Sequence, residues 1–162
     1  MIHPVRSSLC FAIGLWVALA IFDPLVDVAL ASDAQAELLA RANAHRRAEH
    51  LIELRSSPEL VRIAQLHADD MAKRGYLAHV SPEGLDPLQR ARAGGLDGFR
   101  LLAENIGASD VAGSRNQAIF EGWLASHDHR ANLENPAFNT TGIAIARDAR
   151  GRSIAVQLFA TY

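Results

Sequence analysis

The chain has 162 residues, of which 49% are apolar and 21% charged, and its formal net charge is −2. Because no basic run accompanies this balance, the composition argues against a nucleic-acid-binding surface and against a polybasic patch for membranes. The length suits one compact domain behind a short leader, and no internal repeat or low-complexity tract divides it.

The N-terminal residues have the three parts of a secretory signal peptide. Arg6 supplies the positive charge, residues 9–22 are almost wholly apolar, and residues 29–31 read Ala-Leu-Ala, the small-x-small pattern that signal peptidase cleaves. We therefore expect residues 1–31 to be removed, with cleavage after Ala36 as an alternative. An uncleaved membrane anchor is less favoured, because the apolar run is shorter than the roughly 20 residues that span a bilayer.

The predicted mature chain, residues 32–162, contains no cysteine, because Cys10 lies within the leader. An exported protein enters an oxidising compartment, so this domain must be stabilised by packing rather than by disulfides. We expect it to be secreted or periplasmic, monomeric, and without a membrane-spanning segment once the leader is removed.

The first half of the mature chain predicts two helices. Residues 34–49 carry apolar side chains at helical intervals, after a capping-box pattern that begins at Ser32. A second helix starts with the serine, proline and acid of residues 57–59, which are typical of an N-cap and a first helical turn. It ends at Gly75, directly after two basic residues.

The second half predicts shorter helices and strands. A short helix is expected at residues 88–93 and a strand at 101–108, and a capping-box pattern at Ser114 starts another helix. Two β-like runs, 142–146 and 153–159, are separated by a polar turn and predict a hairpin. The predicted helices come first in the chain and the strands come late, without a βαβ alternation. This order indicates an α+β domain with an antiparallel sheet.

Three polar groups are candidates for a functional site. His79 lies in the loop after the second helix, Glu104 interrupts an apolar strand, and His129 lies in the polar segment 127–130. Two imidazoles and a carboxylate are ligands that zinc prefers, and they are also groups that transfer protons. The alternatives are structural: a loop histidine and a buried acid that bond to the backbone.

Other conspicuous residues favour structural interpretations. His127 is two residues from His129, so on a helix the two side chains point in different directions, and only His129 is taken as a site residue. His67 lies on the apolar stripe of the second helix and is expected to be a hydrogen-bonded core residue. Trp123 is expected in the core and His45 on a helix surface.

A series of short motifs covers nearly the whole mature chain. In order they are Asn43-x-x-Arg46, Ala64-x-x-His67-Ala68-x-Asp70-Met71-Ala72, His79-x-Ser81-Pro82-x-Gly84, Pro87-x-x-Arg90, Glu104-Asn105-Ile106, Trp123-x-x-Ser126, His129-Arg130-x-Asn132-Leu133, and Gly142 before a strand with Gln157-x-Phe159. Together they resemble the CAP superfamily of cysteine-rich secretory, antigen 5 and pathogenesis-related proteins, in its short cysteine-free bacterial branch. The resemblance implies an SCP-like α-β-α sandwich, with a small antiparallel sheet between helical layers.

The same resemblance implies a cleft with two histidines and two acids. His79, Glu104 and His129 match three of these positions. At the fourth, three residues after Trp123, many eukaryotic relatives have an acid, whereas this chain has Ser126. We therefore expect a weak or conditional zinc site with both histidines as ligands. Its occupancy should fall as the pH decreases through the histidine range near about 6.5, because neutral imidazole is the binding form.

Three functions are compatible with these residues, and the chemistry, if any, is left open. The resemblance favours a binding module whose cleft, formed by His79, Glu104, Ser126 and His129, takes a metal ion, a small apolar or glycan ligand, a lipid or another cell-envelope component. The second is a metal-assisted hydrolase of peptidase type, in which Glu104 accepts a proton from a polarised water. The third uses Ser126, three residues before His129 and so on the same side of a helix, as a nucleophile with an imidazole base, and it lacks a glycine elbow.

Overall fold

The computed structural model describes residues 24–162, with side chains from residue 33 onward. The predicted apolar run of the leader and Cys10 therefore lie outside the described residues. The elements are α1 (Pro24–Ala48), β1 (Arg55–Ser56), α2 (Pro58–Arg74), α3 (Pro87–Ala93), β2 (Leu101–Ser109), α4 (Arg115–Ala125), α5 (His127–Glu134), β3 (Thr140–Arg147) and β4 (Ser153–Thr161). Among the described helices, none is long and apolar enough to cross a membrane.

Four strands form one sheet in the order β1-β3-β4-β2. β4 pairs antiparallel with β3, which forms the predicted hairpin. On its other side β4 pairs antiparallel with β2, the strand predicted at residues 101–108. The two residues of β1 pair parallel with Thr140 and Thr141, so the sheet is mixed. The sequence did not indicate β1, because two exposed residues carry no periodic pattern.

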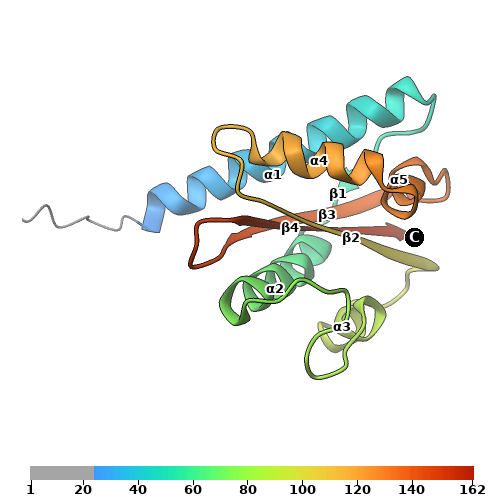
Figure 1. Ribbon diagram of the computed structural model, residues 1–162. Coiled ribbons are helices and arrows are strands. Elements are labelled where there is room, and N and C mark those ends of the chain that lie inside the picture. The colour runs from blue at the N-terminus through green and yellow to red at the C-terminus, as the bar shows by residue number, and fades with distance from the viewer. Residues whose placement is uncertain (1–23) are drawn as a thin grey trace, which may run out of the picture.

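The sheet lies between two helical layers, as predicted. α2 and α3 cover one face, and α1, α4 and α5 cover the other (Figure 1). β3 shows the alternation behind this arrangement: Ala144 and Ala146 face the cluster under α2, whereas Ile143 and Ile145 face the opposite cluster. Every residue of the central strand β4 is buried, because both of its faces are covered.

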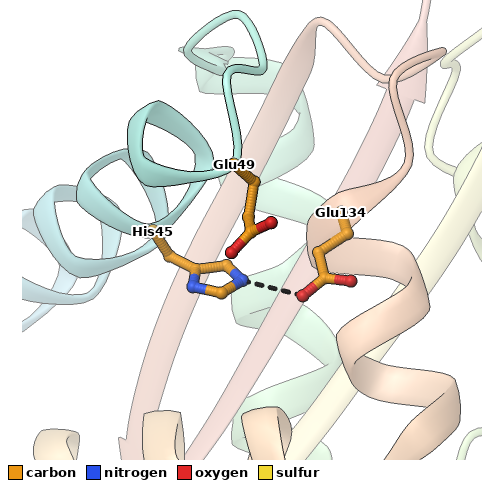
Figure 2. Close-up of side chains that lie close together, drawn as sticks. All are labelled: His45, Glu49 and Glu134. Carbon is orange, nitrogen blue, oxygen red and sulfur yellow. Dashed lines mark hydrogen bonds and ion pairs between the residues drawn. The ribbon is translucent and has the colours of Figure 1, made fainter.

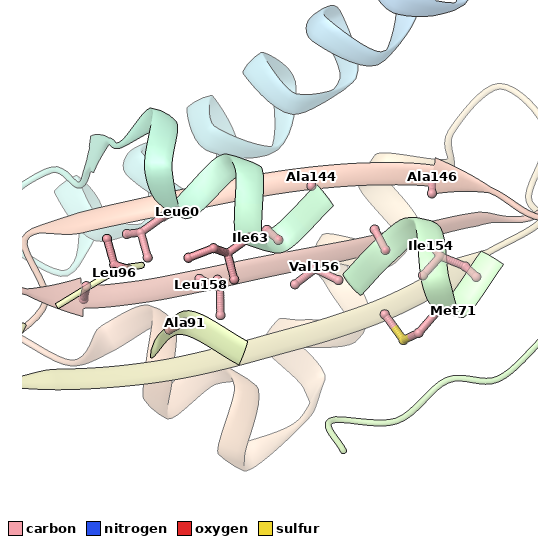
Figure 3. Packing of buried hydrophobic residues seen from close by; sticks show 13 residues of the cluster. Leu60, Ile63, Met71, Ala91, Leu96, Ala144, Ala146, Ile154, Val156 and Leu158 are labelled. Carbon is pink, nitrogen blue, oxygen red and sulfur yellow. The ribbon is translucent and has the colours of Figure 1, made fainter. Parts of the chain in front are cut away.

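The core under α2 is closely packed. Leu60, Ile63 and Met71 of α2 contact the small and branched side chains of β3 and β4 (Figure 3). At Gly142 the backbone of α2 approaches β3 so closely that a methyl group would overlap the backbone of Leu60. A glycine inside a strand therefore marks the point where helix and sheet meet.

The predicted helix ends are partly right. Ser57 accepts a hydrogen bond from the amide of Leu60, and Gly75 ends α2 in the left-handed conformation, as expected. α1, however, begins at Pro24 and not near residue 34, so Ser32 lies inside the helix. Residues 25–48 contain neither glycine nor proline, and nothing in their sequence stops the helix.

The capping box predicted at Ser114 is also wrong. Ser114 precedes α4, but its side chain forms no capping hydrogen bond. The capping box that does form begins at Asp86, where the side chains of Asp86 and Gln89 bond reciprocally to each other's backbone amides at the start of α3. This cap starts α3 at Pro87, close to the predicted helix at 88–93.

Replacing Gly142 by alanine should destabilise the protein, because the added methyl group overlaps backbone atoms that cannot move independently. We expect the free energy of unfolding to fall by about 1 to 3 kcal/mol, measured by urea denaturation. Gly122→Ala is the control, because Gly122 lies exposed within α4 with free space around it. It should raise stability by about 0.5 to 1 kcal/mol. Equal effects of the two substitutions would contradict the close approach of α2.

Candidate functional site

Glu104 lies in β2, at the free edge of the sheet. Leu102 and Ile106, its neighbours at two-residue spacing, pack into the cluster under α2, so Glu104 faces the same side. Its side chain is only 1% exposed. A buried carboxylate is costly unless charged or polar partners compensate for the lost water, and such partners are present here.

Each carboxylate oxygen of Glu104 has a partner. Oε1 lies 2.9 Å from Nδ1 of His79, and Oε2 accepts a hydrogen bond from Nη2 of Arg90 at 2.5 Å. Arg90 also donates from Nη1 to the backbone carbonyls of His79, at 2.5 Å, and Leu85, at 2.9 Å. One arginine of α3 therefore holds both the acid and the loop that carries His79.

The contact with Glu104 assigns the protons of His79. An ionised carboxylate only accepts hydrogen bonds, so Nδ1 of His79 carries a proton, and in the neutral form of the ring Nε2 is the nitrogen with a free lone pair. The His79 side chain is 46% exposed. An imidazole whose inner nitrogen is held by a carboxylate, with the outer nitrogen open to solvent, has the orientation that metal-binding histidines use.

His129 lies in the first turn of α5, and its ring is 6.2 Å from that of His79 between centroids. Nδ2 of Asn105 donates to the backbone carbonyl of His129 at 3.0 Å, and Asn132 bonds to Oδ1 of Asn105. Burial lowers the pKa of His129, and the nearby charge of His79 lowers it further. The His129 imidazole is therefore neutral near neutral pH, which is the state that binds a metal.

The structure thus brings His79, Glu104 and His129 together at the sheet edge, which we call the edge cleft. Their ligand atoms do not all lie within 4.8 Å of one another, and both oxygens of Glu104 already have partners. The edge cleft offers two imidazoles and an acid that orients one of them. Arg90, the other partner of the acid, was not identified as a site residue from the sequence.

Ser126 lies between two helices and not within one. α4 ends at Ala125, α5 begins at His127, and Ser126 itself has an extended backbone and caps neither helix with its side chain. The expectation that Ser126 and His129 share one side of a continuous helix is therefore wrong. His127 is 88% exposed and pairs with Asp128, in keeping with its exclusion from the site.

Two structural predictions are confirmed beside the cleft. His67 is buried, and its Nε2 lies 3.0 Å from the carbonyl oxygen of Ala78. Burial lowers the pKa of His67. Trp123 is also buried, and its indole N–H donates to the carbonyl of Ile106 in β2 at 2.9 Å. Both residues fix the elements around the cleft.

A second cluster of potential ligands was missed. His45, Glu49 and Glu134 have ligand atoms that all lie within 4.8 Å of one another, the only such group of three in the described part of the chain (Figure 2). His45 is not the surface residue that the sequence suggested: its ring packs edge-on against Phe120, and its Nε2 lies 3.0 Å from Glu134. The four-residue spacing of His45 and Glu49 was the only available signal.

Two cavities lie near these elements. One of about 350 Å³ is lined by residues of α2, α3 and the loop between them, including His67, Ser81 and Arg90. A larger one of about 760 Å³ lies between α1, α4 and the β3–β4 hairpin and is lined by charged and small residues. Neither lining includes His79 or His129.

The chain is similar in sequence to known proteins. The model of the CAP family, described as the cysteine-rich secretory protein family, matches residues 39–159. The uncharacterized membrane protein YlbC of Bacillus subtilis (strain 168) is 31% identical over 111 residues, which are 68% of this chain and 31% of that protein. The chain therefore spans about a third of this relative's length.

Solved structures share the fold. An extracellular protein containing a SCP domain from Bacillus anthracis str. Ames has a TM-score of 0.77 and 26% identity, covering 89% of this chain and 45% of that one. An outer surface protein from Borrelia burgdorferi has a TM-score of 0.71 and 22% identity, covering 80% and 92%. These likenesses confirm the predicted α-β-α sandwich.

The interaction between the two imidazoles can be measured in metal-free protein. Because a positive charge on His79 disfavours a second one on His129, His79→Ala should raise the pKa of His129 toward its ordinary value. An NMR titration of the His129 ring signals checks this. His127→Gln, a change at an exposed residue of the same helix, should leave that pKa unchanged. A pKa of His129 that is unmoved by His79→Ala would show that the rings do not interact.

Proposed function

The chain belongs to the CAP family of cysteine-rich secretory proteins, and from this premise we propose that it is an exported binding module whose edge cleft holds a divalent metal ion. One observation carries the proposal. The buried bond between Glu104 and Nδ1 of His79 directs the outer nitrogen of His79 to solvent, beside the neutral ring of His129.

The donor set fits zinc in type but is small. Two neutral imidazoles suit zinc, and Glu104 supplies the orienting carboxylate that usually accompanies such histidines. Ser126 provides no second acid, so two protein ligands leave positions open to water or to an oxygen atom of a bound molecule. When bound, the ion supplies a Lewis acid that attracts such an oxygen. We therefore propose weak binding that a second ligand strengthens.

The chemistry around the cleft supports a ligand that is partly polar and partly apolar. Leu77 and Val80, on either side of His79 in the chain, are both exposed. The same region also has polar side chains: Asn132 bonds to Asn105, and Arg90 bonds to Glu104. An envelope lipid or another small amphiphile, with an oxygen-bearing head group, combines the two requirements better than a purely apolar molecule does.

A hydrolase is not supported by this geometry. Glu104 is buried and its oxygens are bonded to Arg90 and His79, so the acid is placed to hold those two groups rather than to accept a proton from a water. A serine nucleophile needs an adjacent base, and Ser126 lies in an extended joint, without the helical alignment to His129 that this mechanism assumed. Binding without turnover requires neither group.

Export is part of the proposal. The first buried side chain of the described region is Leu38, so removal of residues 1–31 leaves every buried core residue in place, whereas removal of 1–36 would also remove Ala34, which packs against the core. The similarity to an extracellular protein of Bacillus anthracis supports secretion. We propose that the mature domain acts as a monomer toward a small molecule, a lipid or a component of the cell envelope.

Zinc added to the protein should shift the NMR signals of His79 and His129 together, because both rings bind one ion. Glu104→Gln keeps the shape of the side chain but holds Nδ1 of His79 less firmly. We expect the zinc affinity to fall by about 10- to 100-fold, measured by calorimetry.

Glu121→Gln is the matched control, since it makes the same chemical change at an exposed position on α4. It should leave the affinity nearly unchanged. The proposal is contradicted if the signals of the two histidines stay in place at saturating zinc. It is also contradicted if folded Glu104→Gln protein binds zinc as tightly as the original protein does.

A further inference from the structure

We propose that His45, Glu49 and Glu134 form a second metal site, which binds a divalent transition-metal ion between α1 and α5. Figure 2 shows the three side chains pointing toward one another from the end of α1 and the end of α5. The site is separate from the edge cleft and does not depend on its proposed function.

The donor atoms are already close to the required spacing. His45 lies in the last turn of α1, Glu49 is the first residue after this helix, and Glu134 is the last residue of α5. An ion with ligand bonds of about 2.1 Å in tetrahedral geometry separates its donors by about 3.4 Å. The distance from His45 Nε2 to Glu134 Oε1 is 3.0 Å, and all three ligand atoms lie within 4.8 Å. Small side-chain rotations therefore suffice.

The backbone beneath the site is held rigidly. Arg46, the neighbour of His45, is completely buried. Its guanidinium donates to the carbonyls of Leu133 and Asn135, the two neighbours of Glu134, at 2.8 and 3.0 Å. Because this clamp fixes the two ligand-bearing segments relative to each other, little freedom is lost when an ion binds.

The charges at the site favour a cation. Among the described residues, Glu49 forms no ion pair, and the side chain of Glu134 bonds only to the His45 ring. The nearby Arg47 is paired with Glu53, and Arg46 is directed at backbone carbonyls. Both α1 and α5 end here, so the negative ends of two helix dipoles add to the charge of the two carboxylates.

The ligand types indicate the class of ion. One imidazole and two carboxylates suit zinc or manganese, whereas calcium and magnesium prefer oxygen ligands throughout. Three protein ligands also leave at least one coordination position for water. The ring of His45 is only 18% exposed and packs against Phe120, so its direction is set before any ion arrives.

The test uses zinc and manganese in the variant His79→Ala/His129→Ala, in which the edge cleft has lost its imidazoles. Calorimetry should still show one equivalent of zinc. Adding Glu49→Gln, an exposed substitution that does not threaten folding, should raise the dissociation constant about tenfold or more. Glu53→Gln, a change at a nearby exposed glutamate outside the site, should leave the dissociation constant unchanged.

A spectroscopic measurement locates the ion. Manganese should broaden the NMR signals at the end of α1 and the end of α5 first, and Glu49→Gln should weaken that broadening. The proposal is overturned if the His79→Ala/His129→Ala variant binds no zinc, or if Glu49→Gln and Glu53→Gln bind it equally well. These results are independent of the edge cleft, so either site can fail without the other.

Discussion

The carboxylate of Glu104 is buried at the edge of the sheet, and the structure around the cleft satisfies it. An unpaired charge at such a position would cost several kcal/mol. Arg90 binds one oxygen and ties down the loop that carries His79, while His79 binds the other. Arg90 thereby ties the loop and α3 to β2.

The alternation of β2 explains why two histidines from distant segments meet. Glu104 faces the α2 side and holds His79, whereas the next residue, Asn105, faces the opposite side and holds the backbone of His129. Consecutive residues of one strand thus position one imidazole each. Gly107 permits α4 to approach β2, where the Trp123 ring would collide with a larger side chain. Residues of β2 therefore position both histidines of the edge cleft.

The features that could be predicted were local or were tied to the family pattern. Ser57 and Gly75 bound α2 through short-range capping, and the strands of the hairpin have a clear apolar pattern. The resemblance supplied His79, Glu104 and His129, which do come together. The resemblance could not show that Arg90 binds one oxygen of Glu104, because this contact joins α3 to β2 across 14 residues.

The unpredicted features depend on the tertiary structure. The break at Ser126 and the group His45, Glu49 and Glu134 arise from how α1, α4 and α5 pack, and helical spacing alone does not encode this. The buried guanidinium of Arg46 also depends on the tertiary structure, because it binds backbone carbonyls nearly 90 residues away in the chain. Each site therefore depends on an arginine that binds backbone carbonyls, and in the edge cleft this arginine also binds Glu104.

The protonation of the His79 ring tests the central claim most directly. Nitrogen-15 NMR of the histidine side chains in metal-free protein at neutral pH distinguishes which ring nitrogen carries the proton. We predict a proton on Nδ1, directed at Glu104, and a bare Nε2 whose signal moves when zinc is added. A proton on Nε2, with Nδ1 bare, would show that Glu104 does not orient the ring for binding and would contradict the account.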